Sequence, residues 1–174
     1  MLVCGEDLGM VPSCVDPVLE ELRILGLRVQ RMPESGKLDN PADYPYSSVC
    51  TTSSHDIANL RAWLEEPETR ELLAEEFPGM ELTQEALVKQ HLDSPSCLCI
   101  LPIQDVIQML PRYCTRHTQD EVINNPANSK HYWKYRMEND IASTLCKDDE
   151  LIRFVAGMVA AAGRGADIAL TSSS

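Results

Sequence analysis

The sequence predicts an α/β fold built on parallel strands, and three observations support this prediction. Short apolar runs alternate with segments of helical spacing along the 174 residues. Hydrophobic residues make up 44% and charged residues 24% of the chain, as in a globular domain with a sizeable core. Polar pairs directly follow two of the apolar runs, as they do at the carboxyl ends of parallel strands. We therefore expect a succession of β/α units.

The first half of the chain contains three of the four expected strands, at residues 1–6, 27–32 and 47–52. A helix is expected after the first strand, because apolar residues at 18, 19, 22 and 25 share one helical face. Gly26 would cap the end of that helix. A loop rich in Pro, Gly and Asp separates the second strand from the third.

The second half is predicted to be mostly helical. Helices are expected at 56–66, 68–77 and 83–94, the first of them with Asp56 in its opening turn. The fourth strand begins near residue 96 and runs into a loop. A further helical stretch is expected over 133–163, and the last residues resemble a frayed tail.

The charge of the chain argues against two classes of partner. The sequence has 15 Lys and Arg against 27 Asp and Glu, a formal net charge of −12. Nucleic acids and anionic membrane surfaces recruit clustered basic residues, so we expect neither as a partner. No signal peptide is recognisable, and the apolar run at 154–163 is about half the length of a membrane span.

The cysteines indicate a reducing compartment. Seven is an odd number for a disulfide framework, and five of the seven lie in apolar or strand-like settings. We therefore expect buried free thiols and a cytosolic protein. Cys97 and Cys99 would share one strand face, but no second pair follows at zinc-finger spacing. Neither a metal nor a cofactor is expected.

Three polar groups follow apolar runs and carry the candidate chemistry: GEDLG at 5–9, TTSSHD at 51–56 and LPIQD at 101–105. A fourth segment, NNPANSKHYWKYR at 124–136, is rich in Asn and aromatic residues. Carboxylates without Lys or Arg partners, next to His, Asn, Trp and Tyr, suit sugar recognition, because hydroxyls need acceptors and sugar rings stack on aromatic planes. The alternative is that these groups are helix caps and loop polars, which follow strands in any α/β protein.

These segments, taken in order with the stretch between residues 5 and 33, resemble the 4-α-glucanotransferases. These are the amylomaltases or disproportionating enzymes of glycoside hydrolase family 77, and the cytosolic plant and algal type is the most similar. The resemblance covers residues 2–165. It implies that residues 1–165 form the C-terminal half, about four β/α units, of a (β/α)8 or TIM barrel, and that 166–174 form a disordered tail.

The resemblance also implies roles for individual residues. Glu6 matches the general acid/base, which would protonate the glycosidic oxygen and then deprotonate the incoming hydroxyl. Asp56 matches the carboxylate that stabilises the transition state, and His55 matches a neighbouring substrate contact. Asn124 matches an Asn near the donor site.

Other matched residues have two possible roles. Gln104 and Asp105 match a family pair that would contact sugar or anchor the barrel rim through hydrogen bonds. Trp63, Trp133 and Tyr135 match family positions and are expected to be structural. Asp7 should face away from Glu6, because neighbours on a strand point to opposite sides, and should bind backbone or a nearby loop group.

The family's nucleophile is an Asp in an Arg-x-Asp-His block, and the sequence has no such block. We therefore expect a fragment that is inactive alone, with strands near 2–5 and 97–101 exposing edges and apolar surface. The implied substrates are maltose, malto-oligosaccharides and glycogen-like or starch-derived glucans. Three alternatives stay open: a hydrolase of the α-amylase type, a non-catalytic glucan-binding protein, and an α/β domain without a sugar role.

Overall fold

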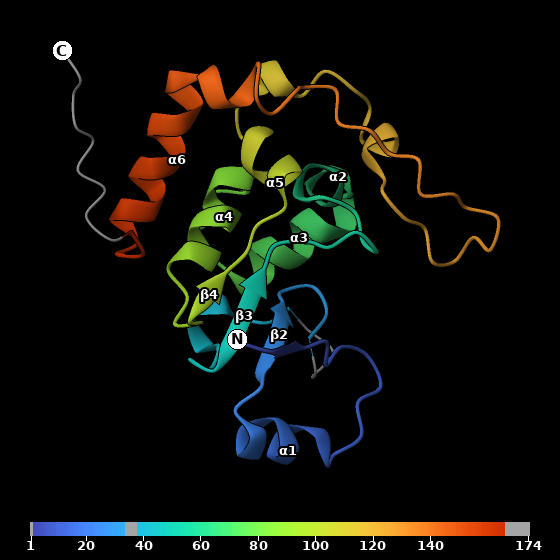
Figure 1. Cartoon of the computed structure of the whole chain (residues 1–174), viewed down its shortest axis with the longest axis vertical. Helices are drawn as coiled ribbons and strands as arrows, with labels where there is room; N and C mark the ends of the chain where they lie inside the picture. The colour runs from blue at the N-terminus through green and yellow to red at the C-terminus, as the bar shows by residue number, and fades with distance from the viewer. Residues whose placement is uncertain (1, 34–37, 166–174) are drawn as a thin grey trace.

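The computed structural model describes residues 2–33 and 38–165, and its centre is a four-stranded parallel sheet (Figure 1). The strands are β1 (Cys4–Gly5), β2 (Leu25–Val29), β3 (Ser48–Thr51) and β4 (Leu98–Cys99). They pair in the order β1-β2-β3-β4, so each strand lies beside its predecessor in sequence. The predicted parallel α/β fold is confirmed, and all four strands are shorter than predicted. The tail expected at 166–174 lies outside the described residues.

The first helix, α1 (Val15–Leu22), ends earlier than predicted. Arg23 terminates it in the left-handed conformation at φ 55°, and its N–H donates to the carbonyl of Glu20. Gly26 lies inside β2 and not at the end of the helix, so the predicted cap was wrong. The glycine is needed there for space, because a Cβ at position 26 would lie 2.8 Å from Oδ2 of Asp7.

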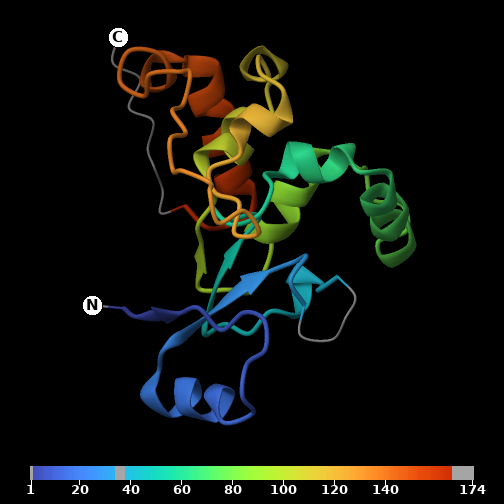
Figure 2. The same cartoon turned by 90° about the vertical axis from the view of Figure 1, so that its right-hand side faces the viewer.

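Three helices follow β3: α2 (Leu60–Glu65), α3 (Pro67–Glu76) and α4 (Gln84–Leu92). Asn59 begins α2, since its side chain accepts a hydrogen bond from the N–H of Ala62, and Thr83 does the same for α4 through Ala86. Asp56 therefore lies in the loop before α2 and not in its first turn, as had been predicted. Figures 1 and 2 show these helices grouped away from α1.

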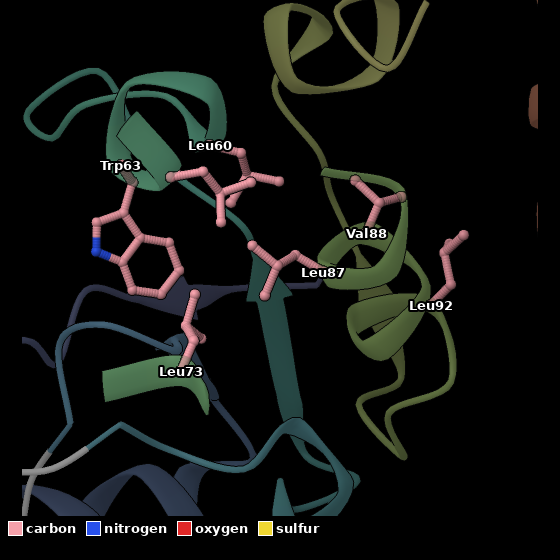
Figure 3. Close-up of a cluster of buried hydrophobic side chains, with 7 residues drawn as sticks. Leu60, Trp63, Leu73, Leu87, Val88 and Leu92 are labelled. Atoms are coloured by element: carbon pink, nitrogen blue, oxygen red, sulfur yellow. The ribbon is translucent and has the colours of Figure 1, made fainter. Parts of the chain in front are cut away.

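The main hydrophobic core is formed by side chains of α2, α3 and α4 that lie close together (Figure 3). Its buried members are Leu60, Trp63, Leu64, Leu73, Leu87, Val88 and Leu92. Burying a Leu side chain stabilises a fold by roughly 1.5–3 kcal/mol, so this cluster holds the three helices together as one layer. The expectation that Trp63 is structural is confirmed.

The chain after β4 contains less helix than predicted. It forms α5 (Ile103–Ile107), three short 3-10 helices (Pro111–Tyr113, Thr118–Glu121 and Leu145–Lys147) and α6 (Asp149–Ala161). Residues 133–144 are irregular, so the helix predicted over 133–163 was wrong in its first part. In this part side chains and carbonyls bind the preceding loop: Arg116 Nη1 donates to the carbonyl of Arg136 at 2.8 Å. Asp148 caps α6 by accepting from the N–H groups of Glu150 and Leu151.

The two faces of the sheet have different surroundings. On one face, Cys50 contacts α4 through the carbonyl of His91. On the other face, Leu27, Val49 and Ile100 line an open pocket. Ile100 is 59% exposed, and Leu2, beside the opposite edge strand, is 73% exposed. The prediction of exposed apolar surface at both edges is confirmed.

The cysteines are all free, but few are buried. Cys50 is buried, whereas Cys4, Cys14 and Cys146 are exposed. The expectation of buried thiols was therefore wrong for most of them, because Cys4 lies in an edge strand and Cys14 and Cys146 lie outside the sheet. In the part of the chain that the structure describes, no helix has the length and apolarity to cross a membrane.

Candidate functional site

An open pocket lies at the carboxyl ends of the strands and collects three of the predicted site residues. Glu6, His55 and Asp56 all line this cavity of about 540 Å³. Its wall is the uncovered face of the sheet, so apolar side chains surround the polar ones. Glu6, directly after β1, and the loop after β3 thus meet in one place, at the edge of the sheet where its parallel strands end.

Asp7 points away from this pocket. Its Oδ1 accepts from the N–H of Leu27 at 2.7 Å, and its Oδ2 accepts from Nη1 of Arg28 at 2.8 Å. Asp7 is 8% exposed, whereas Glu6 is exposed in the pocket. The prediction that these neighbours diverge is confirmed. The pair with Arg28 corrects the expectation that the strand-end carboxylates lack basic partners.

Asp56 is held by two other predicted residues. The Nδ2 of Asn124 donates to Oδ1 of Asp56 at 2.5 Å, and Nε2 of His55 lies 3.2 Å from its Oδ2. The N–H of Asn124 also donates to the carbonyl of His55 at 3.1 Å. Asn124 therefore fixes the His55–Asp56 pair from a segment far along the chain. The side chains of His55 and Asp56 are 50% and 39% exposed, so both remain open to a ligand.

An aromatic side chain extends this group. The ring of Trp133 lies 4.9 Å from the ring of His55, with 46° between their planes. Trp133 is 60% exposed, which corrects the expectation that it packs in the structure. Its indole therefore offers apolar surface to solvent beside the His55–Asp56 pair.

Asp105 is fully buried and holds the loop that carries the pair. Its Oδ2 accepts from the hydroxyls of Thr52 and Ser53, each at 2.6 Å, and its Oδ1 accepts from the N–H of Leu60 at 2.8 Å. Burial raises the pKa of Asp105, and these three donors oppose that shift. Asp105 lies in α5, so one carboxylate connects α5 to both ends of the loop before α2.

Gln104, next to it, holds the segment that carries Asn124. Its Nε2 donates to the backbone carbonyl of Glu121 at 2.8 Å and to the carboxylate of the same residue at 2.9 Å. The hydroxyl of Tyr135 donates to that carboxylate at 2.8 Å, as its expected structural role requires. Burial, reinforced by this bond, raises the pKa of Tyr135 to about 12.

The structure thus divides the predicted residues into two groups. Glu6, His55 and Asp56 line the pocket with Asn124 bonded behind them, whereas Gln104 and Asp105 are buried beneath. Sequence reasoning missed Glu121 and gave no individual role to Thr52 and Ser53 of the TTSSHD group, because no local pattern marks a residue whose partner lies in another element. Among residues 2–33 and 38–165, no three His, Cys, Asp or Glu side chains are grouped to hold a metal ion.

Comparison with known proteins gives consistent results. A family model described as 4-alpha-glucanotransferase matches residues 1–142. The 4-alpha-glucanotransferase DPE2 of Oryza sativa subsp. japonica is 40% identical over 94% of this chain, which covers 18% of the rice protein. The 4-alpha-glucanotransferase of Chlamydia trachomatis is 30% identical over 81% of the chain, which covers 29% of that protein. The chain therefore spans less than a third of the length of these relatives.

Solved structures support the same fold. An amylomaltase from Streptococcus agalactiae, solved in complex with acarbose, superposes with a TM-score of 0.71 at 16% identity, over 94% of this chain and 32% of its own. An amylomaltase from Corynebacterium glutamicum gives a TM-score of 0.60 at 18% identity, over 91% of this chain and 28% of its own.

Proposed function

The chain belongs to the 4-alpha-glucanotransferase family, and from this premise we propose that it forms part of the catalytic centre of a retaining glucosyl transferase. Such an enzyme moves α-1,4-glucosyl units from a donor to an acceptor glucan. One observation carries the proposal: Glu6, His55 and Asp56 share an open pocket in which Asn124 fixes Asp56.

Glu6 acts as the general acid/base. It is exposed at the mouth of the pocket, while the bonds from Leu27 and Arg28 occupy the neighbouring Asp7. Glu6 first protonates the glycosidic oxygen of the donor, so that the leaving sugar departs as an alcohol. It then removes the proton from the acceptor hydroxyl that attacks the glucosyl intermediate.

Asp56 stabilises the transition state by accepting hydrogen bonds from the hydroxyls of the distorted sugar. The bond from Asn124 fixes one of its oxygens, and His55 lies beside the other. An aligned acceptor of this kind needs little reorganisation when positive charge develops on the sugar ring. His55 and Asn124 thus position Asp56, and the exposed His55 ring also contacts the substrate.

Trp133 provides the stacking surface for a sugar ring next to His55. Its exposed indole lies where an apolar sugar face would pass over the pair. For Gln104 and Asp105 the buried bonds favour anchoring over sugar contact, because both side chains are occupied by protein groups.

The fold of the whole enzyme is a (β/α)8 barrel, of which residues 1–165 form the C-terminal half. The sequential parallel order of the strands supports this assignment, because strands follow one another around such a barrel. The apolar face of the sheet, with Leu27, Val49 and Ile100, would be barrel interior. Maltose, malto-oligosaccharides and glycogen-like or starch-derived glucans are the substrates. The free cysteines favour the cytosol as the location.

The nucleophile is contributed by polypeptide outside these residues, because the sequence has no Arg-x-Asp-His block. The purified chain, incubated with maltotriose, should therefore give neither chain-length redistribution nor free glucose. Redistribution at an enzyme-like rate would refute this part of the proposal, and glucose release alone would favour the hydrolase of the α-amylase type.

The role of Glu6 is testable in a chimera in which residues 1–165 replace the matching part of the rice relative. Glu6→Gln should lower disproportionation by about 10²- to 10⁴-fold while glucan binding persists. Glu71→Gln, an exposed control on α3, should leave the rate unchanged. An active Glu6→Gln chimera would exclude Glu6 as the acid/base.

A second candidate function, glucan binding without catalysis, is favoured by the absence of the nucleophile block. The exposed Trp133 makes fluorescence a suitable probe, because a ligand stacked on its indole changes the emission. Maltoheptaose should alter the fluorescence of the chain, and Trp133→Phe should abolish that change. A binding protein would show this response and would also remain inactive in the chimera, which separates the two functions.

A further inference from the structure

Two cysteines occupy paired positions in neighbouring strands on the helix-covered side of the sheet. Cys50 in β3 is the direct partner of Cys99 in β4, and the strands run parallel (Figure 1). Neighbouring strands lie about 4.7–4.9 Å apart. Disulfides join residues whose Cα atoms are roughly 4.4–6.8 Å apart, so the strand spacing lies within the range that a bridge needs.

Both thiols face the helices that cover the sheet. The Sγ of Cys50 lies 3.2 Å from the hydroxyl of Ser94, just after α4, and 3.5 Å from the carbonyl oxygen of His91 at the end of α4. Cys99 packs against the core cluster of α2 to α4. Both sulfurs therefore lie between the sheet and its helices, away from the pocket of Glu6 and Asp56.

The local electrostatics favour a reactive sulfur at Cys50. The neighbouring Cys99 thiol lowers the pKa of Cys50, with help from Ser94, Ser96 and Arg164 and against burial. The same interaction raises the pKa of Cys99, so this side chain stays protonated. A thiolate beside a neutral thiol is the arrangement in which one cysteine attacks an oxidant and the other resolves the product. Cys50 is fully buried, so the oxidant reaches it through a local opening of the helices that cover the sheet.

We propose that Cys50 and Cys99 are a redox modification site that closes to an intramolecular disulfide when a peroxide oxidises the protein. The Cys50 thiolate attacks one oxygen of hydrogen peroxide, the O–O bond breaks, and Cys50 becomes a sulfenic acid while hydroxide takes up a proton to leave as water. The Cys99 sulfur then attacks the sulfenic sulfur, loses its proton and releases a second water. Two thiols and one peroxide thus yield one disulfide and two waters.

The bridge would connect two strands whose following segments carry the site. His55 and Asp56 follow β3, and Asp105 follows β4. Closing the chain between residues 50 and 99 also restricts the unfolded ensemble, so the oxidised protein should melt at a higher temperature than the reduced protein. A reducing agent such as dithiothreitol should reverse that rise.

Cys97 is the competing partner and supplies the control. It precedes β4 by one residue, and its Sγ donates to the carbonyl of Ser48 at 3.4 Å. A Cys97→Ser variant should therefore form the same bridge as the parent chain, whereas Cys99→Ser should not form it.

The experiment treats the dilute 174-residue chain with hydrogen peroxide, removes the peroxide, unfolds the chain in denaturant and alkylates the remaining thiols. The monomer is then isolated and its peptides are mapped by mass spectrometry. The expected product is a cross-linked peptide pair containing Cys50 and Cys99, lighter by two hydrogen atoms and separated by reduction. Because Cys50→Ser could disturb the core, the parent chain gives an independent readout: alkylation of Cys50 and Cys99 should fall together. A sulfinic acid at Cys50 with Cys99 still alkylated, or a bridge to Cys97, would overturn the proposal.

Discussion

Asn124 donates a hydrogen bond of 2.5 Å to Asp56, a residue 68 positions earlier in the chain. The bond joins two segments that share no strand or helix, the loop after β3 and the irregular segment after α5. Gln104 secures the second segment through Glu121, and Asp105 secures the first. The geometry of the pocket therefore depends on α5, which lies outside the pocket.

Replacing Asn124 with Ala should weaken glucan binding. The substitution removes a donor to a carboxylate, a bond of about 1.5–3 kcal/mol, so affinity for maltoheptaose should fall roughly tenfold or more. Fluorescence titration of the chain measures the affinity. The matched control is Asn128→Ala, since the side chain of Asn128 is exposed and accepts a hydrogen bond from the N–H of Lys130 within its own turn. Equal affinities in the two variants would contradict the positioning role.

Asp105→Ala should destabilise the fold strongly. It leaves the buried hydroxyls of Thr52 and Ser53 and the N–H of Leu60 without their acceptor, which costs about 3–5 kcal/mol. Urea denaturation followed by circular dichroism measures the change. Asp120→Ala, at an exposed carboxylate, should stay within about 0.5 kcal/mol of the parent. A small effect at Asp105 would mean that the loop has other anchors.

Two Gly→Ala substitutions should change the stability of the fold in opposite directions. At Gly26 the new Cβ would lie 2.8 Å from Oδ2 of Asp7 and 3.1 Å from Nη1 of Arg28, so the pair must shift and stability should fall by about 1–3 kcal/mol. At Gly157 in α6 nothing lies within 4 Å, and better helix propensity should raise stability by up to about 1 kcal/mol. Thermal melts of both variants test the two predictions. A Gly26→Ala chain as stable as the parent would show that position 26 is not crowded.

His91 should make stability depend on pH. It is fully buried, and burial lowers its pKa from 6.5 to about 4. Between these pKa values the unfolded chain binds a proton that the folded chain does not. The free energy of unfolding therefore keeps the full contribution of neutral His91 above pH 6.5 and falls as the pH decreases toward 4. The loss should reach about 3 kcal/mol.

Denaturation curves at several pH values check the His91 prediction against other titrating groups. His91→Gln should flatten the profile between pH 6.5 and 4, because Gln does not titrate. His117→Gln, at an exposed histidine, should leave the profile of the parent unchanged. If His91→Gln retains the full slope, carboxylates and not His91 cause it.

The parts of the fold that could be predicted are those that depend on short-range pattern. Apolar runs located the four strands, and the alternation of side chains separated Glu6 from Asp7 correctly. Strand ends could not be predicted, because they depend on ladder bonds to neighbours. Gly26 illustrates this limit: it has the form of a helix cap in sequence, but crowding by Asp7 across the sheet explains its presence.

The site was predictable to a similar extent. The polar pairs after the strands marked His55 and Asp56, whereas Asn124 required the family resemblance, since nothing local ties it to Asp56. Trp133 was taken as structural because helical spacing was expected there. The segment is irregular, since its contacts run to Glu121 and Arg116, and the indole faces solvent instead.

The three bonds to Asp105 have a consequence for how the molecule opens. Thr52 and Ser53 lie at the start of the loop and Leu60 lies at its end. One buried carboxylate, that of Asp105, therefore accepts hydrogen bonds from both ends of the loop. The loop cannot open at one end alone, because releasing either end exposes the Asp105 carboxylate that also binds the other end. The amide of Leu60 should then exchange with solvent deuterium only when the whole helical layer opens. On heating, the ability to hold a sugar should disappear together with the core.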